Sequence, residues 1–308
     1  MLDNAGLQGY LLCFSYTHSG NSCIPMNDTH TCTNLFGQRV TVFRNDYVGR
    51  KIATRGLYEK ENLELLLRLL RSLSNPVVLD IGANIGNHTL AFATVASHVH
   101  AFEPIPFIQE VLQQNVEQNG LVNITVHRLA LSDKDDTATI HLDKTGNFGA
   151  SSFDKGNAIA EAVIVKRRRG DALLDELGVE RIDLVKIDVE AHELYVLRGL
   201  LETLKRERPV ITMEWNDTLT IERLNGSPEL QFLLDNYHIQ VLGSSWDRIH
   251  WTGKPLAFLR RSLTKLFTRR RAVLYEFDPT QLYRNLLLIP KDRQDLLELA
   301  AGNERQYF

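Results

Sequence analysis

Acidic residues follow two short apolar runs in the first third of the chain, and glycines accompany the first of them. Asp80 lies near the end of a run that precedes Gly82 and Gly86, and Glu103 closes the run His98–Glu103. A short β-branched run that ends at glycine is typical of a buried parallel strand, and the glycines allow a sharp turn close to a ligand. A helix after the turn would direct free N–H groups at that ligand. The stretch predicts the first βα turn of a nucleotide-binding α/β fold.

The charge at this turn favours one kind of cofactor. The spacing D-x-G-x-N-x-G from Asp80 differs from the dinucleotide fingerprint, and carboxylates oppose a pyrophosphate. S-adenosylmethionine carries no phosphate, and its ammonium, sulfonium and ribose diol can all interact with carboxylates. An acid about twenty residues past the loop, as Glu103 is, can accept a hydrogen bond from a ribose hydroxyl. The alternative is a plain βαβ turn in which Asp80 caps the next helix.

A second group of titratable residues follows the apolar run Ile182–Asp188. The apolar runs 77–81 and 182–188 are the expected strands one and four, which flank the switch point of an open α/β sheet, where ligands bind. Asp188 is therefore expected beside the methyl group of S-adenosylmethionine. Methyl transfer to a hydroxyl benefits from a base within hydrogen-bond reach. His192 is the first candidate because imidazole titrates near neutral pH, and Glu190, Glu214 and Asp188 are the others.

These carboxylates have two further interpretations. Crowding can raise the pKa of one of them toward neutrality, and several together could chelate a divalent metal. Nothing in their spacing favours a metal, and we predict no metal ligands. The alternative for His192 is a residue at a helix N-terminus that is hydrogen-bonded to the backbone.

Four segments, in order, resemble the FkbM-type S-adenosylmethionine-dependent methyltransferases: DIGANIGNHTL from Asp80, FEP from Phe102, ALSD from Ala130 and DLVKIDVEAHE from Asp183. The resemblance extends from about Gly56 to Asn216. It implies an α/β fold of the class I methyltransferase, Rossmann-like type, with a doubly wound, mostly parallel seven-stranded sheet. The family usually has glycine where this chain has Ala191, which favours a turn that avoids positive φ.

The resemblance also implies which residues form the site. In the family the G-x-Y-E stretch lies beside the cofactor, so Tyr58 and Glu59 are site residues, and Glu59 joins the catalytic candidates. A helix N-terminus that favours Glu59 through the macrodipole is the alternative. Ala130 and Leu131 would offer a backbone N–H and an apolar surface to the adenine. The expected cofactor-binding residues are Tyr58, Asp80, Gly82, Ala83, Asn84, Gly86, Asn87, His88, Thr89, Glu103, Pro104, Ala130, Leu131 and Asp188.

Apolar periodicity predicts the elements that position these residues. The expected strands are 38–43, 77–81, 98–103, 124–129, 137–142, 162–166, 182–188, 210–213, 239–242 and 285–289, the last two forming an antiparallel hairpin at a sheet edge. The expected helices are 59–73, 87–96, 105–119 and one helix after 193. Residues 1 to about 35 are read as irregular, and the Gly/Ser stretch 147–152 as part of a lid. We divide the chain into an N-terminal extension (1–55), a methyltransferase core (56–243), a helical insertion (244–284) and a last strand with a tail (285–308).

Composition limits the partners. The 308 residues carry a net charge of −3, with 44% apolar and 24% charged residues, so we expect no nucleic-acid partner. Three cysteines without CxxC spacing favour free thiols. The first residues make a poor signal peptide and no run is long enough to span a bilayer, so the cytosol is the default location. Residues 256–271 predict a basic amphipathic helix, which would contact an anionic membrane surface or an acidic acceptor, or else pack on its own domain.

The sequence therefore predicts an S-adenosylmethionine-dependent O-methyltransferase that acts on a hydroxyl of a carbohydrate or secondary metabolite, as the resemblance implies. N-methylation, a lipid-linked glycan acceptor and a non-catalytic cofactor-binding module stay open as alternatives. The identity of the small-molecule or glycan acceptor and the oligomeric state are also open.

Overall fold

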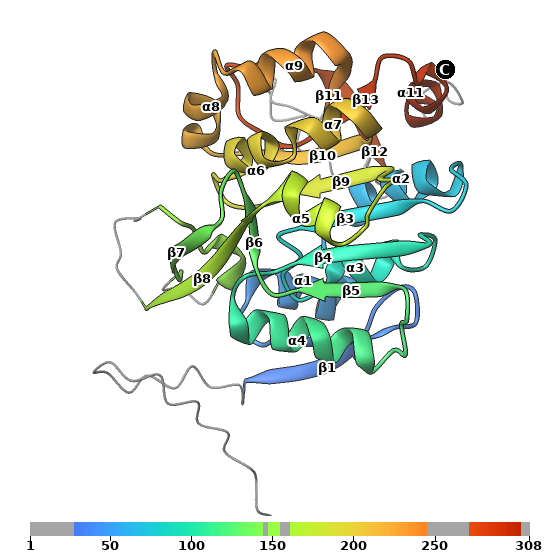
Figure 1. The fold of residues 1–308 in the computed structure, drawn as a ribbon. Helices are drawn as coiled ribbons and strands as arrows, with labels where there is room; N and C mark the ends of the chain where they lie inside the picture. Colours follow the sequence, from blue (N-terminus) through green and yellow to red (C-terminus); the bar gives the residue numbers. More distant parts are fainter. Residues whose placement is uncertain (1–27, 144–146, 155–160, 245–270, 303–308) are drawn as a thin grey trace, which may run out of the picture.

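A computed structural model describes residues 28–143, 147–154, 161–244 and 271–302 (Figure 1). Its central sheet has the strand order β12-β11-β13-β10-β9-β3-β4-β5. Five strands are parallel: β3 (Val77–Ile81), β4 (His98–Phe102), β5 (Ile124–His127), β9 (Leu184–Ile187) and β10 (Val210–Trp215). Antiparallel strands β13 (Tyr283–Pro290), β11 (Tyr237–Ser244) and β12 (Ala272–Glu276) complete the edge.

The mostly parallel α/β fold is confirmed, and one detail is corrected. Strands β3 and β9 are neighbours, so the side of the sheet on which successive strands are added changes between them, as predicted. The described part of the sheet has eight strands rather than seven, because residues 272–276 of the expected insertion pair with β11. The predicted hairpin between β11 and β13 is present, and β12 extends it.

A second, three-stranded sheet stands beside the central one, at the left in Figure 1. It consists of β6 (Ala130–Ser132), β8 (Ala162–Arg169) and β7 (Asp136–His141). The two strands predicted in this region are confirmed, and residues 130–132, expected only as a site segment, form the third. The basic run at the end of β8 is paired with acids: Arg167 binds Asp136 at 2.7 Å.

The N-terminal part of the described chain is more regular than predicted. Residues expected to be irregular form β1 (Thr29–Thr33), which pairs with the predicted strand β2 (Arg39–Phe43). Helix α1 (Tyr47–Arg55) follows and was not predicted; the side chain of Asp46 accepts a hydrogen bond from the Gly49 N–H at its start. These elements belong to the packed structure, since Val42 is 0% exposed.

Nine further helices of the described residues flank the sheets: α2 (Lys60–Arg71), α3 (Asn87–Phe92), α4 (Pro106–Glu117), α5 (Gly170–Glu176), α6 (Glu193–Gly199), α7 (Leu201–Glu207), α8 (Thr218–Leu224), α9 (Pro228–Asn236) and α11 (Gln294–Ala301). The single helix expected after residue 193 is two helices. A Cβ on Gly199 would lie 1.8 Å from the Ser132 carbonyl oxygen, so the chain passes β6 too closely for other residues. Helix α3 ends four residues earlier than predicted, where the Thr94 hydroxyl binds the Ala91 carbonyl.

Three buried apolar clusters hold the layers together. One joins α5, α6 and α9 to β9, β10 and β13; a second joins α2 and α11 to the opposite face; a third joins α4 and β2 to the glycine loop. Within the described ranges, no helix is both long and apolar enough to cross a bilayer. The basic helix predicted at 256–271 lies outside those ranges apart from its last residue, as do Cys13 and Cys23, whereas Cys32 is a free thiol.

Candidate active site

A cavity lies where β3, β4, β9 and β10 end, and it gathers residues from both predicted motif regions. The predicted site residues that line it are Tyr58, Gly82, Asn84, Glu103, Pro104, Ala130, Leu131, Asp188, Glu190, His192 and Glu214. Sequence reasoning missed Tyr47, Ile140 and Phe153, which also line it. The Gly/Ser stretch lies at the cavity as well, since Phe148, Gly149 and Ser151 contribute to its wall.

The glycine loop is shaped by the neighbouring strand. Gly82 has a φ of 76°, and a Cβ there would lie 1.8 Å from the Asp188 carbonyl oxygen. The N–H groups of Gly82 and Ala83 both donate to the Phe102 carbonyl at 3.0 Å. Gly82 is therefore required for the close approach of two strand ends, in addition to any approach of a ligand.

Glu103 ties the second strand end to the loop. One carboxylate oxygen accepts the Asn84 N–H at 3.0 Å and the other accepts the Ile105 N–H at 2.9 Å. The residue is 5% exposed, and this burial raises the pKa of its carboxyl to about 7 despite the two N–H donors. Each oxygen retains a lone pair for a further donor. Glu103 lies at the cavity wall with spare acceptor capacity, and its predicted ribose contact stays a prediction.

Asp80 is paired within the protein. Its side chain is fully buried, one oxygen accepts the Thr89 hydroxyl at 2.6 Å, and the other lies 3.2 Å from the Lys186 ammonium. It is not among the described residues that line the cavity. The prediction that Asp80 presents negative charge to the cofactor stays a prediction, and Lys186 offsets part of that charge.

Lys186 was missed by sequence reasoning, although it lies inside a recognised motif. Its ammonium donates to the Gly82 carbonyl at 2.7 Å and lies 3.3 Å from Asp188. Burial opposes the charged form, but Asp188 and Asp80 together hold the pKa of Lys186 above its usual value. One cation therefore connects the two strand ends on either side of the switch point.

Besides Asp80, five predicted cofactor contacts are not among the described residues of the cavity wall: Ala83, Gly86, Asn87, His88 and Thr89. Two of them support residues that are at the wall or beside it. The Asn87 side chain exchanges two hydrogen bonds with the backbone of Tyr58, at 3.0 and 3.1 Å. His88 lies 3.7 Å from Glu59, and burial lowers its pKa to about 4.

Glu59 lies beside this cavity rather than in its wall. It precedes α2 with a φ of 49°, and its carboxylate accepts the Asn285 amide at 2.7 Å. Burial, and then the charge of Asp188, raise its pKa to about 7. Its carboxylate thus links the start of α2 to β13, and its predicted catalytic role stays a prediction.

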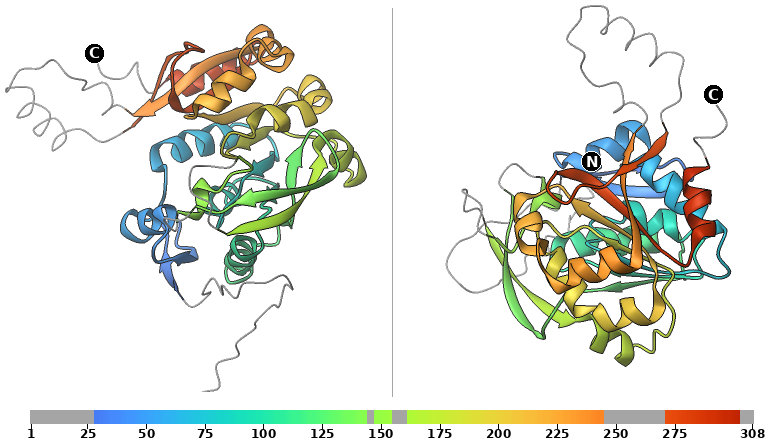
Figure 2. Two further views of the ribbon diagram at one scale, coloured as in Figure 1. Left: turned by 90° about the vertical axis from the view of Figure 1, so that its left-hand side faces the viewer. Right: turned by 90° about the horizontal axis from the view of Figure 1, so that it is seen from above.

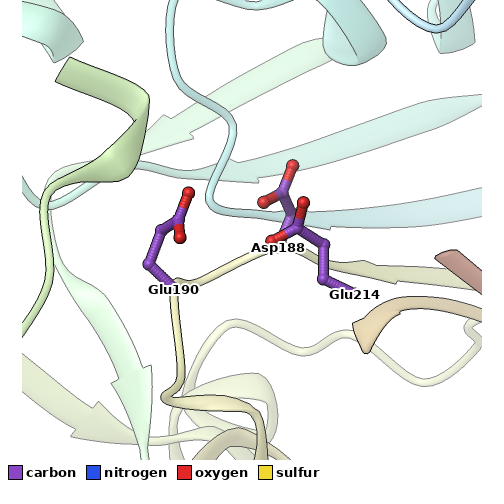
Figure 3. A group of neighbouring side chains, drawn as sticks. All are labelled: Asp188, Glu190 and Glu214. Atoms are coloured by element: carbon purple, nitrogen blue, oxygen red, sulfur yellow. The ribbon is translucent and has the colours of Figure 1, made fainter. Parts of the chain in front are cut away.

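Asp188, Glu190 and Glu214 form the acidic centre (Figure 3), with one oxygen of each within 4.8 Å of the others. Such donors could also share a hard divalent cation. Burial followed by the charges of Asp188 and Glu193 raises the pKa of Glu190 to about 8. Burial and Asp188 likewise raise the pKa of Glu214. Burial also opposes ionisation of Asp188, but Lys186 holds its pKa below the usual value, so Asp188 is the ionised member.

The turn that carries Glu190 contradicts one expectation. Glu190 and Ala191 have φ values of 49° and 70°, so the chain adopts positive φ at Ala191 even without the family's glycine. Two side chains hold this strained turn. The Ser152 hydroxyl donates to the Glu190 carbonyl at 2.8 Å, and Arg223 donates to the Ala191 carbonyl while it binds Asp154.

His192 lines the cavity but is engaged elsewhere. Its Nε2 lies 3.0 Å from the Ser132 hydroxyl, and its ring packs between Phe153 and Tyr195. Burial, and then the charge of Arg167, lower its pKa to about 4, so it is neutral at neutral pH.

The strand order and this acid-lined cavity define a doubly wound α/β protein with a ligand site at the switch point of its sheet. Residues 80–239, about half of the chain, match the family described as the methyltransferase FkbM domain. The chain belongs to the FkbM methyltransferase family, and the predicted family resemblance is confirmed.

Individual relatives are similar over parts of the chain. Methyltransferase sdnD of Sordaria araneosa is 27% identical over 67% of this chain and 88% of its own length. Hexuronic acid methyltransferase AglP of Haloferax volcanii is 29% identical over 57% of this chain and 70% of its own length. The AMB antimetabolite synthetase AmbE of Pseudomonas aeruginosa is 30% identical over 56% of this chain, which covers only 10% of AmbE.

Proposed function

We propose that this methyltransferase takes its methyl group from S-adenosylmethionine and delivers it to a hydroxyl of a carbohydrate or secondary metabolite. The observation that carries the proposal is the Glu103 carboxylate at the end of β4, held by the Asn84 and Ile105 N–H groups at the cavity wall. A carboxylate in this position suits a ribose diol and would repel a phosphate.

The other residues of the cavity fit the remaining parts of the cofactor. Asp188, kept ionised by Lys186, offers negative charge for an ammonium group. Ala130 and Leu131 are buried at the wall and present the small, apolar surface that a flat adenine ring requires. When bound, S-adenosylmethionine supplies a methyl group on a positively charged sulfur, which is open to in-line attack.

Glu190 is the proposed base for the acceptor hydroxyl. Its pKa of about 8 leaves it mostly protonated at neutral pH, and the positive charge of a bound S-adenosylmethionine would favour the ionised carboxylate that general base catalysis needs. Burial and the neighbouring charges of Asp188 and Glu190 raise the pKa of Glu214, which favours its protonated form. The chain would align the acceptor oxygen about 3–3.5 Å from the methyl carbon and exclude water from it.

His192, the first candidate from the sequence, ranks behind Glu190. Its lowered pKa makes it a weak base, and its Nε2 is already paired with Ser132. We assign it a positioning role instead, because it is the N-cap residue of α6, directly after the strained turn of Glu190, and packs on Phe153 of the cavity wall.

The name of one relative supports the acceptor class. AglP is described as acting on a hexuronic acid, and sdnD is described only as a methyltransferase. A carbohydrate hydroxyl is therefore the favoured acceptor.

Equilibrium dialysis with S-adenosylmethionine and with NAD tests the cofactor. We expect S-adenosylmethionine to bind and NAD not to bind. Glu103→Gln should weaken the binding of S-adenosylmethionine, whereas Glu117→Gln at the exposed end of α4 should not. Mass spectrometry across a glycan and metabolite panel then tests transfer as a gain of one CH₂ unit. NAD binding, or a cofactor affinity that does not depend on Glu103, would contradict the proposal.

A further inference from the structure

A second cavity, of about 560 Å³, opens beside the first, and Tyr47 and Tyr58 line both. Its volume lies within the range of about 300–1,000 Å³ that small-molecule sites occupy. Its walls are α1, the start of α2, and the antiparallel edge of the central sheet. Figure 2 shows α1 and α2, in blue shades, on the same side of the molecule as that edge, drawn orange to red.

One wall is a single face of α1. Tyr47, Lys51 and Arg55 are spaced four residues apart, which places them on one side of a helix, and all three line the cavity. The Lys51 ammonium lies 5.0 Å from the centroid of the Tyr47 ring. Gly49 and Ile52 on the other side of α1 are buried, so the helix is fixed with this aromatic and basic face toward the cavity.

The opposite wall repeats this chemistry. Tyr275 of β12 and Tyr283 and Arg284 of β13 line it, and Lys60 lines it at the start of α2. The side chain of Arg284 is 55% exposed, and its guanidinium is 3.7 Å from Glu59. The positive end of the α2 dipole adds to the same field.

The balance of charge in this cavity is positive, unlike that of the first. Among the described residues that line it, Lys51, Arg55, Lys60 and Arg284 are cationic and Glu59 and Glu61 are acidic. The side chain of Glu59 is 7% exposed, accepts the Asn285 amide and lies 3.7 Å from Arg284, so it offsets part of the positive charge and leaves Lys51, Arg55 and Lys60 in excess over Glu61. A chain with an overall charge of −3 thus has a basic, tyrosine-lined cavity next to an acidic one.

We propose that this second cavity binds the acceptor, and that the acceptor is a carbohydrate that bears a carboxylate or phosphate group. The inference rests on the proposed function, whose acceptor class it narrows. Tyrosine rings pack on the apolar faces of sugar rings, and Lys and Arg form charge-assisted hydrogen bonds to carboxylates and phosphates.

The position of the second cavity relative to the acidic centre fits this assignment. In the antiparallel pair of β10 and β13, Glu214 lies opposite Asn285, the residue after Arg284. Tyr58 lies between the two regions, since its phenol is within electrostatic range of both Asp188 and Arg284. An acceptor held at its anionic group by the basic walls can therefore extend a hydroxyl past Tyr58 toward the acidic centre.

The test measures sugar binding to the full chain loaded with S-adenosylhomocysteine. Three probes are titrated: methyl β-glucuronide, glucose 6-phosphate and the neutral methyl β-glucoside. We expect at least one anionic sugar to bind roughly tenfold more tightly than the glucoside, and added salt to reduce the difference. Comparison of the two anionic probes distinguishes a carboxylate from a phosphate acceptor.

The double variant Lys51→Gln/Arg55→Gln should lose most of this preference. The matched control Lys205→Gln/Arg206→Gln removes one lysine and one arginine from α7, where both pair with neighbouring glutamates, and should keep it. Equal binding of the three sugars, no saturable binding of either anionic sugar, or an unchanged preference in the first variant would overturn the inference.

Binding of S-adenosylhomocysteine is measured in the same samples. If it binds with no preference for anionic sugars, the inference on the acceptor fails and the proposed function stands. If it does not bind, the proposed function fails, and the inference fails with it.

Discussion

Gly82 and Asp188 approach so closely that a Cβ on Gly82 would lie 1.8 Å from the Asp188 carbonyl oxygen. This contact joins the ends of β3 and β9 at the point where the sheet order reverses. It fixes the loop that carries Asn84 against the strand end that carries the acidic centre. The two halves of the proposed cofactor site are thus held together by backbone contact.

Gly82→Ala should therefore damage both stability and cofactor binding. Gly37→Ala is the matched control, because Gly37 has the same φ of 76° and a Cβ there meets nothing within 4 Å among the described residues. The control should cost about 1–2 kcal/mol of unfolding free energy from the left-handed backbone alone. Gly82→Ala should cost roughly 1–3 kcal/mol more from overpacking.

Urea unfolding and S-adenosylhomocysteine binding measure the two effects of these glycine variants. We expect Gly37→Ala to bind the ligand as the wild type does, and Gly82→Ala to bind it poorly. Equal losses of stability in the two variants would show that the contact with Asp188 is unimportant.

Lys186 is the second connection across the switch point, and its loss should be costly. Lys186→Met leaves buried Asp80 without its cation, and removal of one partner of a buried pair typically costs about 3–5 kcal/mol of unfolding free energy. The control Lys205→Met breaks an exposed ion pair with Glu202 and should change the unfolding free energy by less than about 1 kcal/mol.

The double variant Asp80→Asn/Lys186→Met should recover part of the unfolding free energy that Lys186→Met loses, because the uncompensated charge of Asp80 is then gone. The same unfolding measurements give the comparison. If the double variant is no more stable than Lys186→Met, the charge on Asp80 is not the cause.

Much of the fold was predictable because its signals are local. The run Val77–Ile81 is confirmed to the residue, since an apolar run that ends at glycine allows few other structures. Helix α1 was missed because its nine residues bury only Gly49 and Ile52, which gives no visible apolar periodicity. Its start depends on the Asp46 cap, and its position depends on packing against β2.

The site was predictable in its residue types but less so in their environments. The acids were found from their places after apolar runs, and Glu103, Asp188, Glu190 and Glu214 do meet at one cavity. The pairing of Asp80 was not visible, because it depends on a lysine more than a hundred positions away in the sequence. Ala191 shows the same limit: Arg223 and Ser152 hold a conformation that residue type alone disfavours.

The affinity for S-adenosylmethionine should rise with pH. Burial gives Glu190 a pKa of about 8, above the usual value, so at neutral pH it retains a proton that the unfolded chain would have lost. Retaining that proton stabilises the fold at low pH, and this contribution is lost as the pH rises through about 8. A cation that binds beside Glu190 favours the ionised form, so its affinity should increase by roughly tenfold from about pH 6 to about pH 8.5.

Isothermal titration at several pH values measures this dependence. S-adenosylhomocysteine lacks the sulfonium charge and should show a smaller rise. Glu190→Gln should flatten the profile for S-adenosylmethionine, whereas Glu176→Gln, which removes an exposed acid paired with Arg168, should not. A profile that falls with pH, or that is the same in Glu190→Gln, would exclude Glu190 as the cation's partner.

The strained turn after β9 gives a last prediction. Ala191 has a φ of 70°, which costs a residue with a Cβ about 1–2 kcal/mol, whereas glycine adopts this conformation freely. Glycine also loses more entropy on folding, by roughly 0.5–1 kcal/mol, so Ala191→Gly should raise the unfolding free energy by about 0–1.5 kcal/mol. Ala53→Gly in the exposed part of α1 should lower the unfolding free energy by about 1 kcal/mol, because Ala53 lies in a helix, where glycine relieves no strain and is less favourable than alanine. Thermal and urea unfolding of the two variants give the comparison. Equal losses would mean that the positive φ at Ala191 carries no cost in the folded chain.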